Sequence, residues 1–288
     1  MRFATLKDDT VAAVTSEDGM VSLDGICGSM IDLAASYETS REAIERAVSE
    51  TTPTALDAAQ LAAPVPAPSK IWAAAGNYKR GGANLTSAGG RGEARERPPD
   101  ELLEHIFLKP PSAVVGPGKD ILIPADAETI FPELELCVVI GRESRDLSMD
   151  EALDAVFGYS VILDVTARGY GSGKNLMGTR CVRKGFDTFA PVGPWIVTRD
   201  QIADPQSLEM RLWVNDDLRQ SASTGGMING VARLVSYLSH VGTLMPGDLI
   251  ASGNPDSPEF QRQLAAGDEL VAEIEGIGQL RLGVARAG

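Results

Sequence analysis

Two strongly apolar segments of this sequence carry acidic residues at their ends. FPELELCVVIG holds Glu133 and Glu135 near its start, and GYSVILDVTAR has Asp164 after its apolar run. Such runs are typical of buried β-strands, in which side chains two positions apart lie on one face. Glu133 and Glu135 therefore share a face about 7 Å apart, with Cys137 and Val139 further along. Two carboxylates so placed repel each other unless solvent or a cation lies beside them.

The third acid favours a cation over solvent. An isolated E-x-E pair is more often a solvated strand end, but Asp164 closes a second apolar strand, where an unpaired charge is costly. Three converging carboxylates form a hard-oxygen site, which suits Mg²⁺, Mn²⁺ or Ca²⁺ better than Zn²⁺. We therefore interpret Glu133, Glu135 and Asp164 as metal ligands.

The net charge and the composition limit the classes of partner that we expect for this protein. The formal net charge of −14 lacks the basic footprint of nucleic-acid binding, so we expect no nucleic-acid partner and a small-molecule substrate instead. No secretory leader pattern is visible, and no apolar run approaches the about 18 residues of a membrane span. We expect a soluble, cytoplasmic protein with no membrane partner. The three cysteines are widely spaced and fit neither a disulfide framework nor a zinc site.

The chain divides at a proline-rich segment, AAPVPAPS, over residues 62 to 69. We expect a small N-terminal α/β subdomain over 1–65 and a catalytic domain over 70–288. In the first part, the capping-box spacing of Thr39 and Glu42 predicts a helix over 40–50.

Two helices are predicted in the larger part. Ser148 and Glu151 form a second capping box before EALDAVFGY. Another helix is predicted from an apolar stripe at helical spacing. The stripe consists of Val231, Leu234, Val235, Leu238 and Val241.

Several blocks in order resemble the fumarylacetoacetate hydrolase superfamily over most of residues 70 to 285. They are FLKPPSAVVGPG, ELELCVVIGR, GYSVILDVTAR, KGFDTFAPVGPWIVT, VNDDLRQ, MPGDLIASGNP and EIEGIGQL. The resemblance implies an α+β fold, predominantly β, with a mixed β-roll or barrel and flanking helices. It also implies a homodimer with one divalent cation per subunit. Glu133, Glu135 and Asp164 would be its ligands, and Lys184 would contact substrate oxygens.

Three residues are candidates for catalysis. Lys184 lies among small and aromatic residues, where its charge could meet an oxyanion, although a surface lysine near a turn is an alternative. Asp187 could pair with Lys184. Arg168 could bind a substrate carboxylate bidentately or pair with an acidic neighbour.

Four further residues are candidates for substrate binding. Lys109 could support the substrate pocket, although a lysine before two prolines is as often merely exposed. Tyr78 belongs to an Asn-Tyr pair that the resemblance places beside the site. Gly253 and Asn254 form a turn after the strand-like DLIAS, and backbone N–H groups of such a turn can hold a carboxylate. A plain loop is the alternative.

The sequence departs from the family pattern near the expected site. Hydrolytic members commonly carry a His and a Glu after the Asn-Tyr pair, in a lid that activates water, but here Gly81 and Asn84 occupy those places. Leu163, Gly169 and Asn254 replace three other family residues. The metal ligands are thus retained while the proton-transfer residues have changed.

Few residues are available as a substitute base. The glycine-rich segment 79–104 is either a lid or a disordered loop, and it carries Glu93 and Glu96. His105 adjoins it and is a weak candidate. His240 falls in a predicted helix, where packing or exposure is the better interpretation.

These observations leave three functions open. The leading one is a metal-dependent enzyme acting on a small 2-oxo acid or 1,3-diketo acid through an enolate, as a decarboxylase, tautomerase or dehydratase. The second is a C–C bond hydrolase of acylpyruvate type with a substitute base. The third is a ligand-binding homologue without catalytic activity, which the altered positions suggest.

Overall fold

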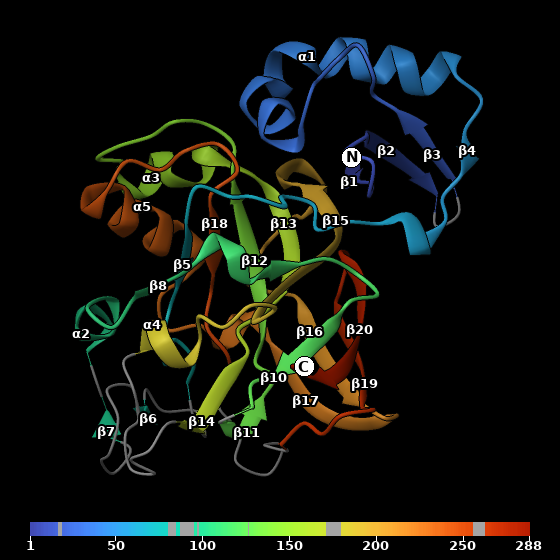
Figure 1. Ribbon diagram of the computed structural model, residues 1–288. Coiled ribbons are helices and arrows are strands. Elements are labelled where there is room, and N and C mark those ends of the chain that lie inside the picture. The colour runs from blue at the N-terminus through green and yellow to red at the C-terminus, as the bar shows by residue number, and fades with distance from the viewer. Residues whose placement is uncertain are drawn as a thin grey trace.

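The computed structural model describes residues 1–16, 19–79, 85–86, 95–96, 98–125, 127–170, 180–255 and 263–288. Its largest element is an eleven-stranded sheet (Figure 1). In spatial order its strands are β4 (Thr54–Ala55), β3 (Gly19–Ser22), β2 (Val11–Ser16), β1 (Arg2–Thr5), β15 (Ala190–Thr198), β13 (Val156–Leu163), β12 (Leu134–Ile140), β18 (Leu249–Ala251), β5 (Ile71–Ala73) and β8 (Phe107–Lys109), with β9 (Val114–Val115) beside β15.

A second sheet has five strands and packs against one face of the first. Its order is β10 (Asp120–Ile123), β20 (Gly278–Arg286), β19 (Glu269–Ile274), β16 (Glu209–Val214) and β17 (Asp217–Ser223). Two-stranded ribbons join β11 (Ala127–Phe131) to β14 (Thr166–Tyr170) and β6 (Leu85–Thr86) to β7 (Arg95–Glu96). The described residues are therefore mostly β, as predicted.

Helices cover the sheets at a few places. They are α1 (Met30–Glu50), α2 (Pro99–Leu103), α3 (Met149–Ala152), α4 (Arg180–Arg183) and α5 (Val231–Val241), with 3₁₀ turns at Ala58–Gln60, Pro111–Ala113, Leu153–Ala155, Arg199–Gln201 and Thr224–Gly226. Figure 1 shows α1 lying over the N-terminal strands. Among the described helices, none is long and apolar enough to cross a membrane.

The helix signals were only partly right. The helix predicted over 40–50 begins at Met30, because Ser29 caps it by accepting a hydrogen bond from the Asp32 N–H at 3.1 Å. The Ser148 and Glu151 capping box is confirmed, but its helix ends at Ala152, and the following apolar residues enter β13.

The apolar stripe predicted for α5 is confirmed except at its end. Val231, Leu234, Val235 and Leu238 are buried, whereas Val241 is 53% exposed. The last turn of the helix therefore lies at the surface.

The N-terminal strands continue the large sheet. β1 pairs antiparallel with β15, where Arg2 faces Val197 and Phe3 faces Ile196. Phe3 also packs into one core cluster with residues of the larger part, such as Phe157 and Val139. The expected subdomain 1–65 thus shares both a sheet and a core with residues beyond the proline-rich segment.

Strand β12 separates two cores. Leu134, Leu136, Val138 and Ile140 join the core that includes the five-stranded sheet, and Cys137 and Val139 join the core that includes α1. The predicted alternation of faces is therefore confirmed. Neighbouring β13 approaches β15 so closely at Gly158 that a Cβ there would lie 2.3 Å from the Val197 carbonyl oxygen. Only glycine permits this backbone contact.

Candidate metal centre

The acidic residues meet because β12 and β13 pair antiparallel. Leu134 faces Leu163 and Glu135 faces Ile162, so the same register sets Glu133 opposite Asp164. The Asp164 N–H donates to the Glu133 carbonyl at 2.9 Å. Residues directly opposite each other on paired strands project to the same face. Glu133, Glu135 and Asp164 therefore converge at one end of the strand pair.

The three carboxylates form a compact cluster. One oxygen atom from each of Glu133, Glu135 and Asp164 can be chosen so that all lie within 4.8 Å of one another. Glu135 and Asp164 are 1% and 2% exposed, whereas the Glu133 side chain is 22% exposed. The cluster is thus closed on its inner side and reachable past Glu133.

Two lysines neutralise part of this negative charge. Lys184, which follows α4, donates to Glu133 Oε2 at 2.7 Å and to Asp164 Oδ2. Lys109, at the end of β8, donates to Asp164 Oδ1 at 2.6 Å and to the Lys184 carbonyl oxygen. Asp164 therefore accepts from both ammonium groups. The predicted alternatives of an exposed Lys109 or a surface Lys184 do not apply, since both side chains are buried.

Burial and charge push the ionisation of these groups in different directions. Burial raises the pKa of Glu135 well above its ordinary value, and the negative charges of Asp164 and Glu133 raise it further. Burial acts the same way on Asp164, but Lys109 and Lys184 outweigh it and lower the pKa of that carboxyl. Burial lowers the pKa of Lys109 despite the contact with Asp164. Of the two buried carboxyls, Glu135 is therefore the one whose neutral form the site favours.

The turn after β18 holds one of the carboxylates. The Gly253 N–H donates to Glu135 Oε2 at 2.7 Å, with Gly253 in a left-handed conformation (φ +100°). A Cβ at this position would lie 2.8 Å from the Asn77 Cβ, so the turn requires glycine. The predicted anchoring of a carboxylate by this turn thus involves Glu135 of the protein itself. Asn254 Oδ1 is buried without a hydrogen-bond partner among the described residues.

The other predicted residues make different contacts. Arg168 is in β14, with its guanidinium 4.4 Å from the centre of the Phe131 ring. Tyr78 is buried, and its hydroxyl donates to Met210 Sδ at 3.5 Å. Burial raises the pKa of Tyr78, and the negative charge of Glu135 adds to the effect. Asp187 is exposed, and Lys184 forms its ion pairs with Glu133 and Asp164 instead.

Two contacting residues were missed from the sequence. Thr166 Oγ1 donates to Glu133 Oε1 at 3.2 Å. The Lys184 ammonium lies 5.5 Å from the centre of the Phe107 ring, a distance suited to a cation–π contact. Thr166 stands two positions after Asp164, so the D-x-T spacing was the available signal. Phe107 lay in a quoted block, but no local pattern links it to Lys184.

The structure describes only some of the residues that were candidates for a substitute catalytic base. Gly81, Asn84 and Glu93 lie outside the described residues, and only the backbone of Glu96 is described. His105 is partly buried in the turn after α2. His240 is exposed near the end of α5, with Nδ1 2.7 Å from the Ser236 carbonyl oxygen, as expected for a surface residue.

The donor set suits a divalent cation. Three carboxylates supply hard oxygen ligands, and positive charge relieves the repulsion between them. Glu133, the most exposed of the three, leaves one side accessible to an ion and a small ligand.

The larger part of the chain, which carries this acidic cluster, matches a known family. The family model for the C-terminal region of fumarylacetoacetate hydrolase covers residues 70–285. The chain belongs to the fumarylacetoacetate hydrolase family.

Relatives of this family member carry several activities. The present chain is 36% identical over 232 residues to maleylpyruvate hydrolase of Aquipseudomonas alcaligenes. This match covers 78% of the chain and 75% of the relative. The chain is also 39% identical over 181 residues to the mitochondrial oxaloacetate tautomerase FAHD2B of Bos taurus. This match covers 60% of this chain and 56% of the relative. The crystal structure of maleylpyruvate hydrolase from Sphingobium sp. SYK-6, in complex with manganese(II) ion and pyruvate, matches all of both chains at 32% identity and a TM-score of 0.82. The chain is accordingly an enzyme of this family.

The stability of the metal-free protein should depend on pH through Glu135. The ordinary pKa of a glutamate is near 4.5, and the folded protein raises that of Glu135. Protonated Glu135 therefore stabilises the folded protein. This stabilisation is fully present below pH 4.5 and is lost as pH rises through the pKa of Glu135 in the folded protein, because the unfolded chain ionises first. We expect the melting temperature in EDTA to fall with rising pH over this window.

The matched variant for this pH prediction is Glu135→Gln. It should flatten the fall of melting temperature with pH in this window and leave the pH dependence elsewhere unchanged. The lowered pKa of Asp164 contributes only as pH falls through and below its ordinary value of 3.8, outside the window. Identical slopes for the two proteins, measured by calorimetry in EDTA, would contradict the assignment.

Proposed function

We propose that this enzyme is metal-dependent and acts on a small 2-oxo acid or 1,3-diketo acid through an enolate. The observation that carries the proposal is the convergence of Glu133, Glu135 and Asp164 with the ammonium group of Lys184. The three carboxylates would hold Mg²⁺ or Mn²⁺, with Ca²⁺ as a further candidate. When bound, such a cation supplies Lewis-acid stabilisation of negative charge on substrate oxygens.

Lys184 provides a second, permanent positive charge at the same point. Lys184 lies between Glu133 and Asp164, and these carboxylates raise its pKa against the effect of burial, so it stays protonated. A fixed ammonium in a buried site stabilises an oxyanion strongly, because no solvent must reorganise as the charge develops. We infer that Lys184 contacts the enolate oxygen of the substrate.

Lys109 and Gly253 position the carboxylates. Lys109 is 1% exposed and meets Asp164 directly, so it acts on the reaction through that carboxyl. The Gly253 N–H fixes one oxygen of Glu135. Substrate specificity then depends on residues around the open side near Glu133, where Arg168 and Asn254 are the candidates for contacting a second carboxylate of the substrate.

Loss of CO₂, tautomerisation and loss of water share this enolate, and we propose them as the leading reaction classes. The similarity to oxaloacetate tautomerase FAHD2B supports this choice. A second candidate is C–C bond hydrolysis, which the full-length similarity to maleylpyruvate hydrolase favours. Cleavage of an acylpyruvate by water also releases a pyruvate enolate, so the same charged groups serve both candidates.

Product analysis by NMR decides between these classes. The purified protein would be incubated with Mg²⁺ or Mn²⁺ and, separately, with oxaloacetate, acylpyruvates or 3-deoxy-2-oxo sugar acids. Metal-dependent enolisation, loss of CO₂ or loss of water supports the leading proposal, and cleavage to pyruvate and a carboxylic acid supports hydrolysis. Full turnover by protein stripped with EDTA would refute metal dependence for both. We also expect a homodimer, which light scattering would test.

Replacement of Lys184 by methionine should separate metal binding from catalysis. Methionine preserves an unbranched apolar stem but removes the ammonium, so we expect kcat to fall by about 10²- to 10³-fold. Mn²⁺ should bind at least as tightly as before, since Glu133 and Asp164 lose a competing cation. Arg46→Met, which removes an exposed charge from α1, is the control. Unchanged kcat in Lys184→Met would remove Lys184 from the mechanism.

A further inference from the structure

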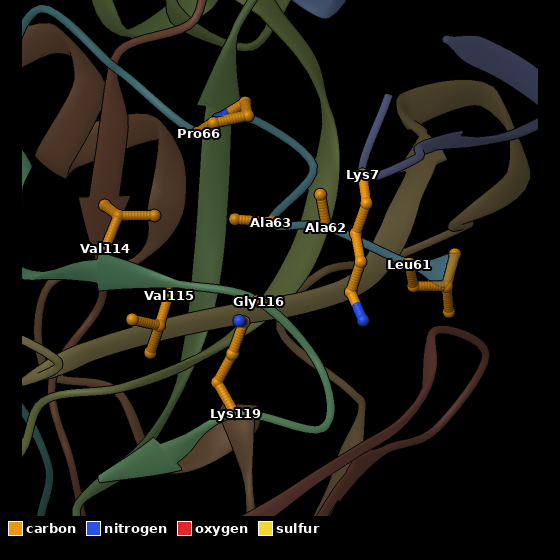
Figure 2. A pocket seen from close by; sticks show the side chains of 9 residues that line it. All are labelled: Lys7, Leu61, Ala62, Ala63, Pro66, Val114, Val115, Gly116 and Lys119. Atoms are coloured by element: carbon orange, nitrogen blue, oxygen red, sulfur yellow. The ribbon is translucent and has the colours of Figure 1, made fainter. Parts of the chain in front are cut away.

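A cavity lies where the proline-rich segment passes beside strand β9. It measures about 200 Å³ and is lined by residues 61–63 and Pro66 on one side and by residues 114–116 on the other (Figure 2). Lys7 and Lys119 complete its rim. None of these residues belongs to the metal centre, so the cavity is a separate feature of the fold.

The walls of this cavity are held in place by backbone contacts. Leu6 and Leu61 form a β-bridge, and β9 pairs in parallel with β15. At Gly116 the two walls touch, because a Cβ there would lie 2.2 Å from the Ala63 nitrogen. The cavity is thus preformed, which reduces the conformational cost of binding a ligand.

The charged residues that line the cavity are positive, whereas the net charge of the chain is negative. The chain has a formal net charge of −14, yet the lining includes two lysines and no acidic residue. Figure 2 shows the two side chains extending from opposite walls, each with its amino group at the cavity. Lys7 donates to the Ala59 carbonyl oxygen at 2.5 Å. No ion pair joins Lys7 or Lys119 to an acidic residue in the part of the chain that is described.

The rest of the lining, which we call the floor, is apolar. Leu61, Ala62, Val114 and Val115 contribute hydrocarbon side chains, which favour contact with an apolar body rather than with a hydrated ion. An apolar pocket with a few polar groups at its rim is the usual form of a small-molecule site. A fully hydrophilic anion such as phosphate would leave this floor unused.

We propose that this cavity binds a small organic acid, with its apolar body on the floor and its carboxylate between Lys7 and Lys119. Ammonium groups form charge-assisted hydrogen bonds with a carboxylate, and neither lysine must first break an ion pair with a described residue. The size of the cavity suits a benzoate-like or short branched acid. The site is independent of the metal centre and of the proposed reaction.

The test uses ¹⁹F NMR with 4-fluorobenzoate as the probe and EDTA in every sample. We expect line broadening of 4-fluorobenzoate, with a Kd of about 1 mM or tighter, and at least about tenfold weaker binding of the neutral 4-fluorobenzamide. Lys7→Met combined with Lys119→Met should lose the preference for the acid. Ala62→Phe, which fills the floor but keeps both lysines, should lose binding of both probes.

The controls separate this cavity from the metal centre. Lys184→Met and Arg46→Met should bind 4-fluorobenzoate as the unchanged protein does, and thermal melts would confirm that every variant is folded. Binding lost in Lys184→Met but kept in Ala62→Phe would locate the probe at the metal centre and overturn the proposal. Absence of broadening in the unchanged protein would also overturn it, as would a change of oligomeric state in Ala62→Phe, since the cavity would then receive a second copy of the chain.

Discussion

Glu135→Gln is expected to lose metal binding and turnover while the protein stays folded. Glutamine cannot supply the negative charge that a divalent cation requires, and loss of a direct ligand should exceed the about 10- to 100-fold cost of losing an outer partner. The fold should survive because burial and Asp164 already favour the neutral form of Glu135 without metal. An amide oxygen can still accept the hydrogen bond from the Gly253 N–H.

Calorimetric titration with Mn²⁺, NMR turnover assays and thermal melts in EDTA would test this result. Glu143→Gln, an exposed glutamate changed in the same way, is the matched control and should behave as the unchanged protein. If Glu135→Gln kept Mn²⁺ affinity within about threefold, Glu135 would not be a ligand, and the proposed metal centre would have to be reassigned.

Asp164→Ala is expected to cost both activity and stability. Asp164 accepts from Lys109 and Lys184, which are 1% and 4% exposed, so its removal leaves two buried ammonium groups with fewer partners. Breaking a buried ion pair by removing one partner lowers the free energy of unfolding by about 3 to 5 kcal/mol. Metal binding and turnover should be lost as well.

Urea denaturation of the metal-free proteins would measure the cost of Asp164→Ala. Adding Lys109→Met should recover part of the lost free energy, because methionine replaces an unpaired charge by an apolar side chain of similar length. The double variant should remain inactive. If Asp164→Ala denatured at the same urea concentration as the unchanged protein, the ion pairs with Lys109 and Lys184 would carry no net stability.

Local pattern was sufficient for strand β12 and its two faces. The two-residue alternation in β12 placed Glu133 and Glu135 with Cys137 and Val139, and the structure keeps that division between two cores. The helical stripe of α5 was found for the same reason, since periodicity records which face is buried. The start of α1 was missed because an internal Thr-x-x-Glu spacing imitates a cap, whereas Ser29 is the true one.

The composition of the site needed the tertiary structure. Sequence reasoning chose the three carboxylates, but it gave Lys184 the wrong neighbour in Asp187 as one option and left Lys109 undecided. The fold brings Lys184 and Lys109 to Asp164 across 20 and 55 residues, and the Gly253 N–H to Glu135 across 118. No local period encodes such separations.

The sequence by itself therefore determined which residues are strand ends, which of them share a face and which family the blocks resemble. Only the tertiary structure decided which cations neutralise the acids, which carboxyl has its pKa raised by burial, and that β1 extends the large sheet through β15. The physical reason is that side-chain periodicity is a property of a few consecutive residues. Ion pairs, burial and strand order depend on chain segments that meet only when the whole core is packed.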